Sequence, residues 1–334
     1  MGQGQEVKIR PESQVQIQER GEIFFFYRPK VNKEEVHSAD EVQRLYIVLR
    51  PESGERSVEE KQDQLSGKEG FMHKSSQTET TVTSGSYQGG HGTEEVNIEK
   101  QPLLRLILMG KKSLPDPAKK KGVPYWGFVE LVTTQIEDIK TALKGEEYET
   151  STRGHRHQPG GRALGEGIYR ILRHYPNKKM HTHLIYKLEF PAENAKNEPQ
   201  ESLNIERQGS FLIQIKNPDD HGQQHGGGST STSSSGGASG FRGLPNKRKA
   251  MFPAHLQGQF GHNRYSPADP PDFLNYEGCE FLLIAASDDI GEELGLDLKP
   301  EGCDSSDKSC SDLVNTFGEN AAYSTKPLFE GTWD

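Results

Sequence analysis

The chain is 334 residues long, carries a formal net charge of -9, and has only 31% apolar or aromatic residues. It has no apolar run near the ~20 residues of a membrane-spanning helix, and its start, MGQGQE, fits neither a signal peptide nor a myristoylation pattern. Three unevenly spaced cysteines exclude a disulfide framework, so we expect a soluble protein of a reducing, intracellular compartment.

The first predicted elements follow an N-terminal segment, residues 1–18, and fill residues 19–150. The continuous apolar run IFFFY at residues 23–27 predicts a strand that is buried on both faces. Further strands are predicted at residues 45–49, 103–109 and 126–132. The spacing of Ile136, Ile139 and Leu143 then indicates one face of a short helix. We interpret this series as a first β-repeat.

The same series of elements returns in residues 165–298, after a basic linker at residues 151–164. Ile290 and Leu294 indicate its closing helix. Its strands are predicted at residues 168–172, 184–190, 210–216 and 280–285. We interpret this series as a second β-repeat.

Two near-copies support an internal duplication. VNIEKQ at residues 96–101 reappears as LNIERQ at residues 203–208, and each copy leads into the third predicted strand of its series. A shift of 151 residues without a gap also aligns Tyr125 with Tyr276. Because the matched segments keep the same order in both halves, a chance match is a poor explanation.

Three stretches are too polar to bury enough apolar area to offset the entropy of ordering them. We predict disordered inserts at residues 53–95 and 219–245, and a disordered acidic tail at residues 299–334. The remaining elements predict a mainly β fold, in which two tandem pseudo-equivalent repeats share one core. Half a small sheet cannot cover its own apolar face, so the halves should close as a sandwich or a barrel.

Five segments resemble a family of uncharacterised proteins found in plants and some bacteria. They are GEIFFFYRPKV (21–31), VQRLYIVLRPE (42–52), YWGFV (125–129), GEGIYRILR (165–173) and SPADPPDFLNYEGCEFLL (266–283). The resemblance covers the predicted strands and most of their connections. It implies an old soluble domain and no particular activity.

The charge is distributed unevenly along the chain. Residues 103–190 carry 16 Lys and Arg against 9 Asp and Glu, whereas residues 266–334 carry 3 against 16. The densest cationic region joins the two repeats, and guanidinium groups match the geometry of phosphate and carboxylate. We therefore predict an anion site there, although a charged linker would have the same composition. Its candidate residues are Arg153, Arg156, Arg162, Arg170 and Arg173.

A His-x-His pair offers a second candidate site. His181 and His183 would share one face of a strand, where two imidazoles can reach one metal ion, and His174 could supply a third nitrogen. The alternative is that the pair simply lies on a wetted sheet face. Glu189 is six positions after His183, which departs from the three or four positions of cupin-type metal enzymes.

The sequence favours a non-enzymatic binding or scaffold protein over a metal-dependent enzyme that uses the His-x-His pair. The expected partner is acidic: a phosphate-bearing ligand, a nucleic acid such as RNA, or an acidic protein segment. A structural protein whose disordered inserts carry the interaction motifs is a further alternative. We expect it in the cytoplasm, with the nucleus as an alternative because Lys247, Arg248 and Lys249 form a short basic cluster.

Overall fold

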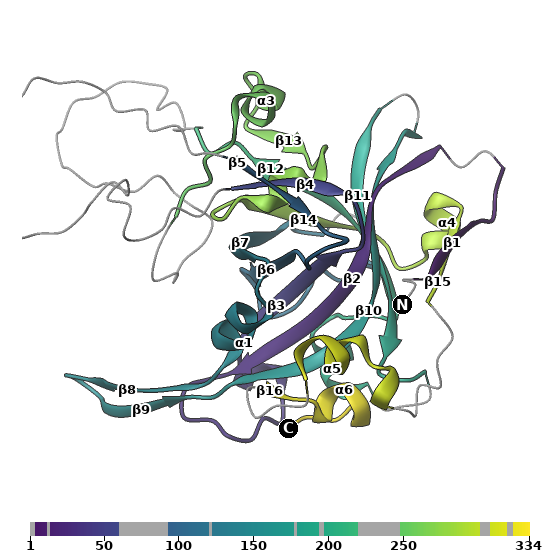
Figure 1. The fold of residues 1–334 in the computed structure, drawn as a ribbon. Helices are drawn as coiled ribbons and strands as arrows, with labels where there is room; N and C mark the ends of the chain where they lie inside the picture. Colours follow the sequence, from purple (N-terminus) through teal and green to yellow (C-terminus); the bar gives the residue numbers. More distant parts are fainter. Residues whose placement is uncertain are drawn as a thin grey trace, which may run out of the picture.

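Eight antiparallel strands of the computed structural model close into a barrel (Figure 1). They are β2 (Val15–Pro29), β3 (Val42–Pro51), β6 (Leu104–Met109), β7 (Tyr125–Thr133), β10 (Gly161–His174), β11 (His181–Phe190), β12 (Gln208–Lys216) and β14 (Glu280–Ser287). Their order is β11-β10-β2-β3-β6-β7-β14-β12, and β12 pairs with β11 to complete the ring. Each of these eight strands contains most or all of one predicted strand, so the mainly β prediction is confirmed, with the barrel as its form.

The structure describes residues 4–11, 14–59, 93–119, 122–176, 179–193, 197–219, 248–300, 308–318 and 323–334. Most of the two predicted inserts, residues 60–92 and 220–245, lies outside the described residues. The ends of the first insert are described and form a hairpin of β4 (Glu55–Glu59) with β5 (Thr93–Asn97).

The strand order contains two four-stranded meanders. β2, β3, β6 and β7 are successive neighbours, and β10, β11, β12 and β14 are successive neighbours. The meanders meet where β2 pairs with β10 and where β7 pairs with β14. VNIEKQ ends just before β6, and LNIERQ runs into β12, so each lies at the third strand of its meander.

Buried side chains on alternate positions of β2 form two separate cores. Phe25 and Tyr27 belong to a cluster that takes residues from all eight barrel strands, which is the barrel interior. Phe24 and Phe26 belong to a second cluster, which includes residues of α1 (Ile136–Leu143), α5 (Asp312–Phe317) and α6 (Lys326–Glu330) on the outside. β2 is thus buried on both faces, as its continuous apolar run predicts.

Smaller elements decorate the barrel. β8 (Glu146–Thr150) and β9 (Gly154–Gln158) form a hairpin that projects from it in Figure 1, and we call this hairpin the β8–β9 arm. The others are β1 (Gln5–Lys8), which pairs with β15 (Leu296–Lys299), β13 (Tyr265–Pro267), β16 (Tyr323–Ser324), α2 (Glu198–Ser202), α3 (Ala254–Gln257) and α4 (Ile290–Leu294). Residues 151–164, predicted as a basic linker, form the arm's tip, its second strand and the start of β10.

The prediction of a disordered tail is wrong for residues 308–318 and 323–334. Leu313 and Phe317 of α5 and Leu328 of α6 are fully buried against the outer face of the barrel. The ring of Phe317 meets the ring of Phe24 edge to face, with centroids 5.4 Å apart. A few well-placed apolar side chains anchor this otherwise polar segment. Cys310, just before α5, is disulfide-bonded, which the cysteine count did not predict.

Candidate functional site

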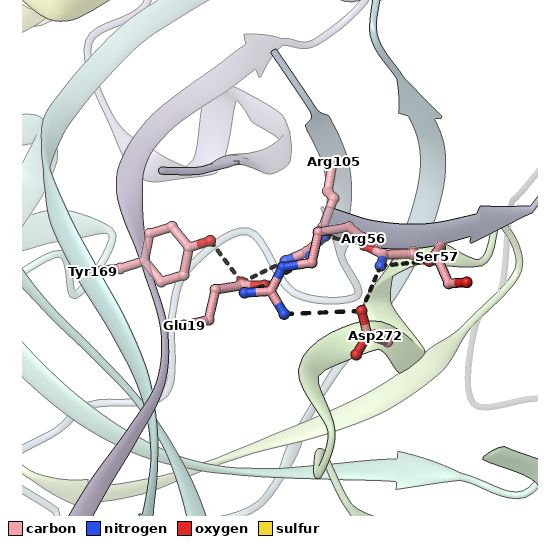
Figure 2. Close-up of polar contacts among 7 residues, drawn as sticks. Glu19, Arg56, Ser57, Arg105, Tyr169 and Asp272 are labelled. Atoms are coloured by element: carbon pink, nitrogen blue, oxygen red, sulfur yellow. Dashed lines mark hydrogen bonds and ion pairs between the residues drawn. The ribbon is translucent and has the colours of Figure 1, made fainter. Parts of the chain in front are cut away.

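A charged cluster lies inside the barrel, where Glu19 of β2, Arg105 of β6 and Tyr169 of β10 point toward one another (Figure 2). Arg105 donates from two guanidinium nitrogens to the two carboxylate oxygens of Glu19, at 2.6 and 2.9 Å. The hydroxyl of Tyr169 donates to the same carboxylate at 2.7 Å. Neither Glu19 nor Arg105 has any exposed side-chain surface. This is the bidentate, charge-assisted pairing that arginine makes best.

The cluster continues to groups outside the barrel strands. Arg56 of β4 lies 3.5 Å from Glu19 and 3.9 Å from Asp272, which is in the short helical segment Pro271–Asn275 (Figure 2). The Nε of Arg105 donates to Asn275 of the same segment at 2.8 Å. The cluster therefore ties the β4–β5 hairpin and this segment to the barrel interior.

The charged groups of this cluster pair with and neutralise one another. Burial alone would raise the pKa of Glu19, but the charge and hydrogen bonds of Arg105 outweigh it and hold this pKa below its usual value. Burial beside Glu19 raises the pKa of the Tyr169 hydroxyl well above its usual value. Because the Glu19–Arg105 pair is fully buried, a ligand cannot reach it. We interpret it as a structural interaction between strands.

A pocket of about 560 Å³ lies at the other end of β6 from Arg105. It falls within the ~300–1,000 Å³ range of small-molecule sites. It is lined by Gln43, Arg44, Met109, Gly110, Lys111, Lys112, Ser113 and Tyr125. Three of these lining residues are cationic and none is acidic, so the lining carries a net positive charge.

The positive charge of this pocket is poorly compensated. The ammonium of Lys112 donates to the backbone carbonyl of Asp40 at 3.1 Å. Partial burial and the charge of nearby Lys30 lower the pKa of Lys112, and the charge of Asp40 offsets part of this shift. Lys111 forms no ion pair with any described residue. Arg44 is partly balanced, because its charge acts on the carboxyl of Glu130. The two lysines are therefore the groups available to an anion.

The backbone beside these lysines is fixed at both ends. The N–H of Gly110 donates to the carbonyl of Trp126 at 2.8 Å, and the N–H of Leu114 donates to the carbonyl of Leu203 at 3.0 Å. Between them, the N–H groups of residues 111–113 have no hydrogen-bond partner in the described part of the chain. These amides remain available to solvent or to a ligand.

The five predicted arginines do not form one site. Arg153 and Arg156 lie on the β8–β9 arm, whereas the other three follow one another along β10. Each arginine of β10 already has a carboxylate partner: Arg162 pairs with Asp334 at 2.7 Å, Arg170 with Glu6 at 3.0 Å and Arg173 with Asp269 at 2.6 Å. Neighbours in sequence on a strand alternate between faces, so a dense run of charges need not converge.

The three predicted metal ligands do come together, at the ends of β10 and β11. His174 lies opposite His181 in the ladder, and its ring is 5.3 Å from that of His183. Burial and the two neighbouring imidazoles lower the pKa of His183 to about 3, so its ring is neutral. Among the described residues, no group of three or more His, Cys, Asp or Glu side chains is arranged to hold a metal ion.

His183 is also unsuited to activating a nucleophile. Its Nδ1 lies 3.0 Å from the hydroxyl of Ser210 and 3.9 Å from the carboxylate of Glu293. A catalytic relay needs the nucleophile and the carboxylate on opposite ring nitrogens, whereas both groups here face the same one. Ser210 is moreover fully buried.

Sequence reasoning missed the basic pocket, although a signal was present. The connection between β6 and β7, residues 110–124, contains five lysines and one aspartate. GKKS at residues 110–113 lacks the upstream glycine of a P-loop, so it matches no phosphate-binding motif. Lysine density marks this connection as strongly cationic, and the folded chain places two of its lysines, Lys111 and Lys112, in the pocket wall.

Comparison with known proteins gives no relative. No family model, curated protein or solved structure matches the chain. Within the described residues, no helix has both the length and the apolar character needed to cross a membrane. The function is therefore inferred from the geometry of the site.

Proposed function

We propose that this protein is a non-enzymatic binding module that takes an anionic ligand or the acidic part of a partner into the pocket at the end of β6. One observation carries the proposal: Lys111 and Lys112 line a pocket that has no acidic residue in its wall. Like charges in the wall of one pocket repel one another, and a bound anion relieves this repulsion.

The paired state of the other cations supports this choice. The three predicted arginines of β10 are each neutralised by a carboxylate, and Arg105 is buried against Glu19. The pocket also joins the ends of β3, β6 and β7, so its residues are held by the barrel. A ligand would meet a preorganised group of donors there, which lowers the entropy cost of binding.

We also propose that the barrel arose by duplication of a four-stranded unit. The two meanders run in the same chain order and meet through equivalent pairings, β2 with β10 and β7 with β14. VNIEKQ and LNIERQ lead to β6 and β12, the third strand of each unit. The basic pocket would then be a feature of the first unit alone, because LNIERQ is followed by a β12–β14 connection of different sequence.

The experiment is to titrate anions into the full chain and into two variants of equal charge change. In K111Q/K112Q the two pocket lysines are neutralised, and in R153Q/R156Q two arginines of the β8–β9 arm are neutralised. We expect pyrophosphate and citrate to bind the wild type, to bind K111Q/K112Q at least tenfold more weakly, and to bind R153Q/R156Q unchanged. Equal loss in both variants, or no binding of either anion at millimolar concentration, would overturn the proposal.

A further inference from the structure

The pocket contains both charged and neutral hydrogen-bond donors. Together they indicate the chemical class of the anion that it binds. The segment of residues 110–113 offers two ammonium groups, the hydroxyl of Ser113 and the unpartnered amides of residues 111–113. We infer that the ligand is a phosphate monoester, bound as its dianion by this segment. The inference rests on the proposed function and specifies its ligand class.

The number of these donors exceeds what a carboxylate can accept. A carboxylate has two oxygens in one plane, whereas a phosphate monoester presents three terminal oxygens arranged around phosphorus. Lysine ammoniums act as compact charges with no fixed plane, and they suit such a group. Amide N–H groups in succession supply further donors, a feature that recurs in phosphate-binding loops.

The remaining walls of the pocket suit the organic part of such an ester. Met109 and Tyr125 belong to or pack against the apolar barrel interior, and Gln43 adds a polar group beside them. A pocket of about 560 Å³ has room for more than an inorganic phosphate. An ester whose organic group contacts Tyr125 therefore uses both parts of the pocket.

The charge of the ligand distinguishes a phosphate ester from other anions. The second ionisation of a phosphate monoester has a pKa of about 6, so its charge doubles between pH 5 and pH 7.5. Sulfate esters and carboxylates carry a single charge over this range. A dianion stabilises the charged form of Lys112 more than a monoanion does, because the attraction grows with the charge of the ligand. This attraction opposes the partial burial and the charge of Lys30, which lower the pKa of Lys112, and it adds to the charge of Asp40, which raises it.

The test is isothermal titration calorimetry of the full chain with phenyl phosphate, phenyl sulfate, benzoate and inorganic phosphate. We expect phenyl phosphate to bind at least tenfold more tightly than the other three at pH 7.5. Its affinity should rise about tenfold between pH 5 and pH 7.5, while that of phenyl sulfate stays level or falls. S113A should weaken phenyl phosphate about tenfold, because it removes a hydrogen bond to a charged group.

The outcomes separate this inference from the function on which it rests. If benzoate or phenyl sulfate binds as tightly as phenyl phosphate and K111Q/K112Q abolishes that binding, the phosphate assignment is wrong while the anion-binding function stands. If inorganic phosphate binds as tightly as phenyl phosphate, the inference that the ligand carries an organic group is wrong. If no anion shows binding that depends on the two lysines, both proposals fail. Circular dichroism and the unfolding midpoint of each variant check that it remains folded.

Discussion

Arg105 and Glu19 meet inside the barrel through two contacts of 2.6 and 2.9 Å, and neither side chain reaches solvent. The pair joins β6 to β2, which are separated by β3 in the strand order. Removing two charges from water costs several kcal/mol per ion, and here the direct pairing, Tyr169 and Asn275 offset that cost. The pair is therefore sensitive to the loss of either partner.

E19Q should lower the free energy of unfolding by about 3–5 kcal/mol, because it leaves the guanidinium of Arg105 buried without its counter-charge. Urea unfolding followed by tryptophan fluorescence measures this loss. E19Q/R105M should lose less than the two single variants combined, since the partners act together. E137Q, which breaks the exposed Glu137–Lys140 pair, is the control and should change little. A loss below about 1 kcal/mol in E19Q contradicts the role given to this pair.

F317A should also destabilise the fold, by about 3–5 kcal/mol, because it leaves a cavity between α5 and the barrel. Phe317 is fully buried and contacts Phe24 and Phe26 edge to face. N315A changes an exposed residue of the same short helix and serves as the control. If residues 312–317 were disordered, as the polar composition of residues 299–334 predicts, both variants would unfold at the wild-type urea concentration.

The parts of this fold that could be predicted are those whose sequence pattern depends on neighbouring residues. IFFFY at residues 23–27 and the alternating apolar strands reveal β2 and its neighbours, because their pattern depends only on adjacent residues. α5 was missed because it is anchored by few apolar side chains within a polar stretch. The pair of Glu19 with Arg105 joins residues 86 positions apart, and no local pattern predicts which charges meet.

The candidate site was missed for the same reason. Arg162, Arg170 and Arg173 are close in sequence, but their partners Asp334, Glu6 and Asp269 come from distant segments. Charge density along the chain cannot show which cations are already neutralised. What distinguishes Lys111 and Lys112 is the lack of a carboxylate in their pocket, and this is a property of the folded chain.

Glu166 should make stability fall as the pH rises from about 6 to 9. Its carboxyl group accepts the hydroxyl of Ser311 at 2.7 Å and the N–H of Leu313 at 3.0 Å, at the start of α5. Burial raises its pKa to about 8; these hydrogen bonds oppose the shift, whereas the charges of Glu189 and Asp312 add to it. Because the folded pKa exceeds the unfolded value, the folded state holds an extra proton, and its stabilisation is lost as the pH passes about 8.

The corresponding measurement is the urea midpoint of the wild type and of E166Q at pH 6 and pH 9. The wild type should lose roughly 2 kcal/mol over this interval through Glu166. Glu22, whose pKa burial raises to about 7, adds a loss of the same sign. E166Q keeps an oxygen acceptor for Ser311 but cannot ionise, so it should lose distinctly less. An identical decline in both proteins means that Glu166 does not ionise in this range.

His183 should make the fold less stable at low pH. Its variants also test whether the ring serves packing or metal binding. Burial and its neighbouring histidines lower its pKa to about 3 from a usual 6.5, so the unfolded chain binds the proton more readily. Stability is then lost as the pH falls from about 6.5 toward 3, and H183Q should show a smaller loss than the wild type. H181Q removes a less buried ring and is the matched control.

A zinc titration tests the metal-binding role of the same histidines. If His183 only packs, a tenfold excess of zinc at pH 7.5 should shift the melting temperatures of wild type, H181Q and H183Q alike. A rise confined to the wild type would establish the metal site.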